Sequence, residues 1–289
     1  MKQPVFSGVC TALVTPFLNG EINYPLFDQL LRYQLDGGVK SVVISGTTGE
    51  SPTLSDQEKI LLFKRAKEYT QNTCTIIAGT GSNATNHSVA LSVAAQKAGA
   101  DALLAVAPYY NKGNPEGLYL HFATIAKSVD IPVILYNVPG RTGVDIPVSV
   151  YKKLAEIPNI AGVKEASTDI TKVIRIHTEC PKDFYVWSGN DDQIVPVIAS
   201  GGQGVISVLS NIFPQETVLM ADAALAGDFD TAAAIQTNLL PIIDLLFCEV
   251  NPIPVKYALK HTGFDCGPCR LPLGPLSGIN QKKIDKYFE

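Results

Sequence analysis

Short runs of β-branched and apolar residues recur eight times along the first three quarters of the chain. Val42–Ile44 and Val133–Leu135 are two of them, and neither alternates between apolar and polar residues. Unbroken apolar runs are typical of parallel strands that are buried on both faces. Successive runs start 19 to 33 residues apart. The predicted strands begin at Val9, Val42, Thr75, Ala102, Val133, Ile160, Tyr185 and Gly204.

Helical segments with start and stop signals separate these strands. Ser55 and Glu58, for example, form a capping box before an apolar run. We expect the eighth helix over Pro214–Leu225. Eight βα units are accommodated most simply by an α/β fold that closes into a (β/α)8 TIM barrel, here over residues 1–227.

Residues 228–289 follow the last unit without a long linker. They contain helical patterns at Asp230–Phe247 and Pro254–His261, then a Gly/Pro-rich stretch and a short charged end. We expect a helical appendage that packs on the barrel or on a neighbouring subunit and carries no catalytic group.

Composition excludes several classes of protein. Hydrophobic residues make up 46% of the 289 residues and charged residues 17%, which supports a large buried core rather than disorder. A net charge of −4 gives no surplus of positive charge for nucleic acid or an anionic membrane. No leader peptide or membrane-spanning run is evident, and six cysteines are too sparse for a disulfide scaffold. We expect a cytosolic protein with reduced thiols.

The residues that end each strand are the informative ones, because a βα barrel forms its active site there. Lys164 ends the sixth strand after Ile160–Val163. A lysine in such an apolar setting can act as an amine nucleophile toward a carbonyl, with tyrosine and threonine hydroxyls nearby to move protons and no metal required. The alternative is a structural lysine paired with Glu165 or another acid.

Three further strand ends carry polar groups. Ser45–Glu50 is a Gly-bracketed turn that can present hydroxyls and backbone N–H groups to a small anion. Arg141 follows the fifth strand. It either binds a carboxylate through two hydrogen bonds of its guanidinium or is a solvated turn residue. Tyr109 and Tyr110 follow the fourth strand and can belong to the site, to a subunit interface or to both.

Four ordered segments together resemble the dihydrodipicolinate synthase family, which belongs to the N-acetylneuraminate lyase and class I aldolase superfamily. The similarity extends over essentially the whole chain. The segments are Gly46–Glu50, Tyr136–Gly143, Gly162–Glu165 and Asn251–Lys256.

The resemblance implies a lyase reaction in lysine and diaminopimelate biosynthesis. Lys164 would form a Schiff base with pyruvate, and the derived enamine would attack L-aspartate 4-semialdehyde, giving 4-hydroxy-tetrahydrodipicolinate without a cofactor or metal. Tyr136, Thr47 and Tyr110 would relay protons, with Tyr110 supplied by a partner subunit. Family members are commonly homotetramers built as dimers of dimers.

The resemblance also assigns the residues that bind the substrates. Thr47 and Thr48 would hold the pyruvate carboxylate, and Arg141 would receive the carboxylate of the semialdehyde. Gly189 and Ile206 would contribute backbone atoms near pyruvate. N-acetylneuraminate lyases and 2-keto-3-deoxy sugar-acid aldolases share the lysine but usually lack this arginine, so they are the alternative reading.

Lysine-sensitive members of the family bind L-lysine at a subunit interface. Three of the corresponding positions depart from the sensitive pattern: His87 replaces a glutamate, and Asp56 and Lys59 replace histidines. Feedback inhibition is therefore expected to be weak or absent. The corresponding positions are Ser51, Pro52, Asp56, Lys59, Asn83, His87 and Tyr109.

Two motifs indicate other functions and are weaker. Gly79–Ala84 resembles a dinucleotide fingerprint, but Asp101 begins the next strand instead of closing it. Cys266 and Cys269 have thioredoxin-type spacing, which suggests a thiol-redox protein, but they lie in a Gly/Pro-rich tail. Adding His261 gives three ligands, one short of a closed zinc site. His121 and His177 lie in helical patterns and are expected to be surface or packing residues.

Overall fold

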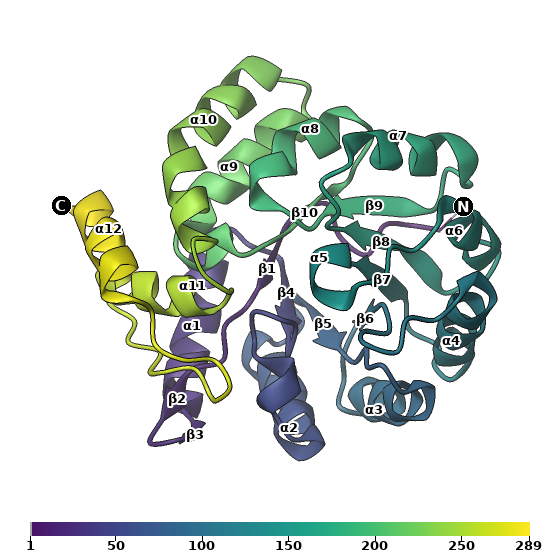
Figure 1. Cartoon of the computed structure of the whole chain (residues 1–289), viewed down its shortest axis with the longest axis horizontal. Coiled ribbons are helices and arrows are strands. Elements are labelled where there is room, and N and C mark those ends of the chain that lie inside the picture. Colours follow the sequence, from purple (N-terminus) through teal and green to yellow (C-terminus); the bar gives the residue numbers. More distant parts are fainter. Residues whose placement is uncertain (1) are drawn as a thin grey trace.

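Eight parallel strands close into a barrel in the computed structural model, which describes residues 2–289 (Figure 1). β1 pairs with both β10 and β4, so the sheet has no free edge. Six strands begin where the sequence predicted, and β1 and β4 begin one residue earlier. The fold-class prediction is confirmed. The strands are β1 (Gly8–Ala12), β4 (Ser41–Ile44), β5 (Thr75–Gly79), β6 (Ala102–Val106), β7 (Val133–Asn137), β8 (Ile160–Glu165), β9 (Tyr185–Ser188) and β10 (Gly204–Ser207).

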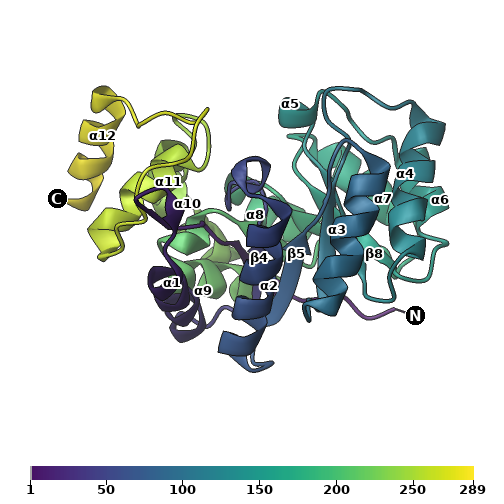
Figure 2. The same cartoon turned by 90° about the horizontal axis from the view of Figure 1, so that it is seen from below.

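Helices surround the barrel on its outer face (Figures 1 and 2). The predicted capping box is present, since the Glu58 backbone N–H donates to Ser55 Oγ over 3.2 Å and the Ser55 N–H donates to Glu58 Oε2 over 2.7 Å. The eighth helix has the predicted bounds. The outer helices are α1 (Tyr24–Asp36), α2 (Asp56–Thr70), α3 (Thr85–Lys97), α4 (Pro115–Lys127), α6 (Val148–Leu154), α7 (Ile170–Glu179), α8 (Ile194–Ala199) and α9 (Pro214–Leu225).

Three shorter elements interrupt this repeat. A small antiparallel hairpin of β2 (Phe17–Leu18) and β3 (Glu21–Ile22) precedes α1. A single helical turn, α5 (Pro139–Thr142), follows β7. Figure 1 shows α5 in front of the barrel, at the end where the strands terminate.

The apolar core has two layers, which explains why the strands lack alternation. The inner layer fills the barrel and includes Cys10, Ile77 and Trp187, and the outer layer lies between the strands and helices. Trp187 donates its indole N–H to the Phe6 carbonyl over 3.1 Å and stacks on the Phe6 ring. Because Phe6 precedes β1, this pair closes the end of the barrel opposite the predicted site.

The C-terminal appendage, residues 228–289, contains α10 (Phe229–Leu246), α11 (Ile253–Ala258) and α12 (Gly278–Phe288). The first two match the predicted patterns to within a few residues. The charged end was not predicted to be helical, yet it forms α12. Figures 1 and 2 show α12 to one side of the barrel, and it packs against α10 and α11.

Two ion pairs connect the appendage to the segment between β4 and α2. Lys256 Nζ lies 2.9 Å from Glu50 Oε1, and both side chains are almost fully buried. Arg270 forms a forked contact with Glu58 at the start of α2, with a shortest distance of 2.6 Å. The appendage is therefore fastened to the same segment that carries the predicted anion-binding turn.

Replacing Arg270 with methionine should destabilise the protein in a pH-dependent way. The Arg270 guanidinium, together with Ser55, lowers the pKa of Glu58 from 4.5 to about 2. A carboxyl group whose pKa is lowered by folding stabilises the protein above its unfolded pKa, and this stabilisation disappears as the pH falls from about 4.5 toward about 2. We expect R270M to lower the free energy of unfolding by about 1–2 kcal/mol at pH 7, measured by urea denaturation.

The difference between R270M and wild type should shrink as the pH falls below about 4.5. Lys260→Met is the matched control, because it removes the exposed Lys260–Asp265 pair in the same appendage. It should change stability by less than about 0.5 kcal/mol. A pH-independent loss in R270M would show that packing, rather than the ion pair, accounts for the effect.

Candidate active site

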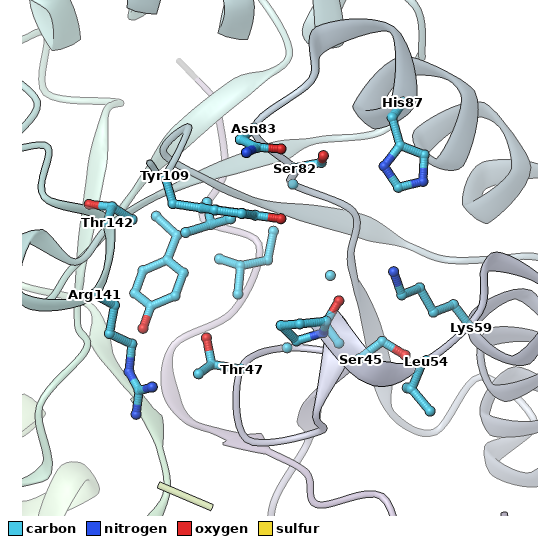
Figure 3. Close-up of a pocket in the computed structure, with 18 of the residues that line it drawn as sticks. Ser45, Thr47, Leu54, Lys59, Ser82, Asn83, His87, Tyr109, Arg141 and Thr142 are labelled. Atoms are coloured by element: carbon cyan, nitrogen blue, oxygen red, sulfur yellow. The ribbon is translucent and has the colours of Figure 1, made fainter. Parts of the chain in front are cut away.

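Two adjoining cavities open at the C-terminal ends of the strands. The smaller, of about 70 Å³, is lined by residues that end β7, β8 and β9 and by two residues of the appendage. The larger, of about 690 Å³, extends from this point toward α2 and α3. Thr47, Tyr136 and Arg141 line both cavities. Figure 3 shows the larger one, with Thr47 and Arg141 at one side and Lys59 and His87 at the other.

Lys164 projects from β8 into the smaller cavity and is 5% exposed. Its register partner across the sheet is Tyr136 on β7, and Nζ lies 4.5 Å from the centre of the Tyr136 ring. The closed sheet therefore places an amine and a phenol side by side. Among the described residues, no carboxylate forms an ion pair with Lys164.

The alternative pairing of Lys164 with Glu165 is wrong. Successive residues of a strand face opposite ways, so Glu165 lies in the outer layer. There its carboxylate accepts hydrogen bonds from Asn137 and Tyr151, and it lies 3.7 Å from Lys172. With Glu165 engaged elsewhere, the Lys164 amine remains available for covalent chemistry in the cavity.

The turn after β4 places two threonines at the cavity. It begins and ends with Ser45 and Glu50 in the left-handed region, at φ of 56° and 58°. Gly79 at the end of β5 permits this path, because a Cβ there would lie 2.2 Å from the Ser45 carbonyl oxygen. Thr47 is half-buried and Thr48 is 2% exposed. Their hydroxyls suit hydrogen bonding to a small carboxylate.

Arg141 lies on the α5 turn at the mouth of the cavities. Its Nη2 donates to the Asn251 carbonyl oxygen over 3.1 Å, which holds the guanidinium at the rim while leaving its other N–H groups free of described partners. A guanidinium with free donors can bind a carboxylate through two parallel hydrogen bonds. Arg141 therefore lies at the entrance with donors that could receive a carboxylate.

Gly189, after β9, also lines the smaller cavity. A Cβ on Gly189 would lie 2.5 Å from the Ala166 Cβ, so a side chain cannot be accommodated without a shift. Ile206 does not line either cavity. It is fully buried in the inner layer on β10, two residues before Val208, which does line the smaller cavity.

Tyr110 is separated from the other predicted residues. It is 90% exposed, has a φ of 73°, and lines neither cavity of its own chain. Its neighbour Tyr109 lines the larger cavity. This arrangement leaves the Tyr110 side chain accessible to another molecule.

The sequence analysis missed two residues of the site, Phe247 and Asn251. Both belong to the appendage and line the smaller cavity. Asn251 Nδ2 donates to Thr48 Oγ1 over 2.9 Å, and its backbone carbonyl accepts from Arg141. The expectation that the appendage carries no catalytic group did not include these contacts with the cavity. The Asn251-Pro252 pair before α11 is visible in the sequence, but it does not indicate which residues Asn251 contacts.

The larger cavity is lined by all seven positions that correspond to the family's L-lysine site. Asp56 is the acidic residue of this described lining, and its carboxylate is already engaged. His87 Nε2 lies 2.8 Å from Asp56 Oδ2, and Lys59 Nζ lies 3.7 Å from Asp56 Oδ1. Lys59 is 7% exposed, and burial lowers its pKa, an effect partly offset by Asp56.

The two tail cysteines do not form a reactive pair. Cys266 is fully buried, and both thiols are free. Burial raises the pKa of Cys266 and of Cys269 to about 12 each, with Glu50 contributing at Cys269. A redox cysteine instead needs an accessible thiol with a lowered pKa, so the thiol-redox alternative is not favoured. In residues 2–289 no group of three or more His, Cys, Asp or Glu side chains could hold a metal ion.

The remaining weak motifs have structural explanations. Asp101 precedes β6, pairs with Lys67 and accepts from the Ile76 backbone N–H over 2.8 Å, far from a ribose-binding position. His121 is buried in α4 beside Thr85, and burial lowers its pKa to about 4. No helix in the described part of the chain is long and apolar enough to cross a membrane.

Comparison with known proteins agrees with the fold and indicates the family. The model of the dihydrodipicolinate synthetase family matches residues 5–289. A 4-hydroxy-tetrahydrodipicolinate synthase from Acetivibrio thermocellus is 47% identical over 280 residues, covering 97% of this chain and 95% of the relative. One from an Exiguobacterium species is 48% identical over 286 residues, covering 99% and 98%.

Solved structures give the same assignment. The dihydrodipicolinate synthase of Aquifex aeolicus superimposes with a TM-score of 0.96 at 41% identity, covering 98% of this chain and 97% of that one. The enzyme of Thermotoga maritima gives 0.95 at 40% identity with the same coverage. With its barrel, its unpaired Lys164 beside Tyr136 and full-length relatives of this kind, the chain belongs to the dihydrodipicolinate synthetase family.

Proposed function

We propose that the protein condenses pyruvate with L-aspartate 4-semialdehyde through a Schiff base on Lys164, in lysine and diaminopimelate biosynthesis. The observation that carries the proposal is the buried Lys164 amine, which opens into a cavity beside Tyr136 and forms no ion pair with a described carboxylate. The names of the relatives support the same activity.

The proposed reaction begins when the Lys164 amine adds to the pyruvate ketone carbon. The carbinolamine loses water to give an imine, and removal of a C3 proton gives an enamine. The enamine carbon attacks the aldehyde of the second substrate. The amino group of that substrate then adds to the imine carbon, which closes the ring and releases Lys164. Tyr136 is placed to move protons at the amine, and Thr47 lies next along the same cavity.

Arg141 favours the amino-acid aldehyde over a sugar aldehyde as second substrate. The semialdehyde brings a carboxylate to the entrance, where a guanidinium can bind it, whereas the sugar-acid tail brings mainly hydroxyls. The sugar-acid aldolase and N-acetylneuraminate lyase alternatives are therefore not favoured. Pyruvate occupies the inner part of the site, and a structure of the Acinetobacter baumannii relative is described as complexed with pyruvate.

We further propose a cytoplasmic homo-oligomer, a tetramer formed as a dimer of dimers, in which Tyr110 of one subunit completes the proton relay of another. Its 90% exposure and its distance from its own cavities support this. A related structure is described as a monomeric variant. Sedimentation equilibrium measures the assembly, and a fully active monomer would contradict the proposal.

Borohydride trapping tests the Schiff base directly. Incubation with pyruvate and sodium borohydride should add a reduced three-carbon group to one lysine and abolish activity. Peptide mapping by mass spectrometry should locate the adduct on Lys164. Lys172→Arg is a matched control, because Lys172 is a buried lysine of the outer layer that should remain unmodified and dispensable for trapping. An adduct elsewhere, or none, would rule out the proposed mechanism.

Replacing Arg141 with alanine should separate the two substrates. We expect the KM for L-aspartate 4-semialdehyde to rise roughly tenfold or more, because a charge-assisted contact is lost. Borohydride trapping of pyruvate should be nearly unchanged, since Lys164 is not altered. Steady-state kinetics with each substrate varied, and with sugar aldehydes as alternative acceptors, gives the readout. Unchanged semialdehyde kinetics would remove Arg141 from this role.

L-lysine should inhibit the protein weakly or not at all. The larger cavity lacks a free carboxylate among its described residues, and Lys59 places positive charge where a ligand ammonium would enter. A related structure from Cyanidioschyzon merolae is described with lysine bound, and that protein serves as the lysine-binding comparison. Activity should persist with millimolar L-lysine in the assay. Inhibition at sub-millimolar concentrations would contradict this prediction.

A further inference from the structure

Asn251 contacts one residue expected to bind each substrate carboxylate, Thr48 for pyruvate and Arg141 for the semialdehyde. Its side-chain Nδ2 donates to Thr48 Oγ1 over 2.9 Å, and its backbone carbonyl accepts from Arg141 Nη2 over 3.1 Å. The residue is 5% exposed and lines the cavity that contains Lys164. Its Oδ1 atom is buried without a described partner, which is uncommon for a purely structural amide.

The direction of the Thr48 hydrogen bond matters. A hydroxyl has one hydrogen to donate, whereas an amide NH2 group can only donate. Thr48 Oγ1 is therefore the acceptor in its bond with Asn251, and the Thr48 hydrogen has no described protein acceptor. That hydrogen is left to point toward an anion in the cavity. Asn251 thus sets Thr48 as a donor to the pyruvate carboxylate.

A buried ion pair connects the segment that carries Thr48 to the segment that carries Asn251. Glu50 lies two residues after Thr48, and Lys256 lies five residues after Asn251 in the last turn of α11. Their side chains are 0% and 3% exposed. Lys256 Nζ also donates to the Thr15 and Pro268 carbonyls, over 3.1 and 3.2 Å.

We propose that Asn251 is a positioning residue for both substrates, whose amide orients the Thr48 hydroxyl toward pyruvate and whose carbonyl orients the Arg141 guanidinium toward the second substrate. The Lys256–Glu50 pair fixes Asn251 in this place. The proposal rests on the proposed function and on the pyruvate-carboxylate role that the family resemblance gives to Thr48. It assigns the C-terminal appendage a part in substrate binding.

Asn251→Asp and Asn251→Ala test the side-chain role. Aspartate has nearly the same shape but accepts from Thr48, so it would take the hydrogen that pyruvate needs. We expect both variants to raise the KM for pyruvate roughly tenfold, the factor for one hydrogen bond to a charged group, with a larger rise for N251D. The semialdehyde KM should change less, since the backbone carbonyl that contacts Arg141 remains. Asn280→Ala is the control, because it removes a side-chain amide hydrogen bond of similar length elsewhere in the appendage, from Asn280 to Glu249.

A double-mutant cycle shows whether Asn251 acts through Thr48. In a Thr48→Val background, Asn251→Asp should change the pyruvate KM by less than about twofold, because the contact is already absent. Lys256→Met should raise the KM for both substrates, since it releases the backbone as well as the amide. A merely structural role would lower the melting temperature or the active fraction and leave these KM values unchanged.

The outcomes separate this proposal from the proposed function. If wild-type protein forms no trapped pyruvate adduct on Lys164, the proposed function fails. If wild type is trapped normally and the Asn251 variants retain the wild-type pyruvate KM, the positioning role is overturned. The positioning role is also overturned if Asn280→Ala raises the pyruvate KM as much as Asn251→Ala does. It is overturned as well if the Thr48→Val and Asn251→Asp substitutions have additive effects on the pyruvate KM.

Discussion

Closure of the eight-stranded sheet is the constraint on which the site depends. β1 pairs with β10 on one side and with β4 on the other, so no strand can slip without breaking two ladders. The register places Tyr136 opposite Lys164. A slip of one residue would turn Lys164 into the outer layer and bring Glu165 into the cavity, because strand side chains alternate between faces. Barrel closure therefore decides which of these two adjacent ionisable residues faces the cavity.

The appendage depends on a second constraint, the burial of the Lys256–Glu50 pair. Removing one partner of a buried pair leaves an uncompensated charge and typically costs about 3–5 kcal/mol, although a buried pair adds little net stability compared with apolar packing. What the pair provides here is specificity of position. Glu50 also accepts from the Arg270 backbone N–H over 2.8 Å, so one carboxylate fixes both α11 and the loop that follows it. The turn carrying Thr47 and Thr48 is therefore attached through Glu50 both to α11 and to the loop that contains Arg270.

The barrel was predictable because burial on both faces of each strand leaves an unbroken apolar run in the sequence. Strand ends then located Lys164, Tyr136 and Thr48, since parallel strands end on one rim. Helix α12 was not visible, because Ile284 is its one fully buried residue among those described and its other contacts are long-range. The Asn251 contact was equally hidden, since its partner Thr48 lies 203 residues away. Tyr110 is exposed and lines neither cavity of its own chain, so its proposed role depends on a second subunit.

Electrostatics connects the neutral amide of Asn251 to the chemistry of the site. The chain carries a net charge of −4, yet the charged residues of the described lining of the smaller cavity are Arg141 and Lys164. The carboxylates of the two substrates therefore meet a locally positive field inside a protein that is negative as a whole. An acidic residue at position 251 could also contact Thr48, but it would cancel part of this field and reverse the direction of the hydrogen bond. A neutral amide orients the hydroxyl and the guanidinium without adding negative charge where two carboxylates must bind.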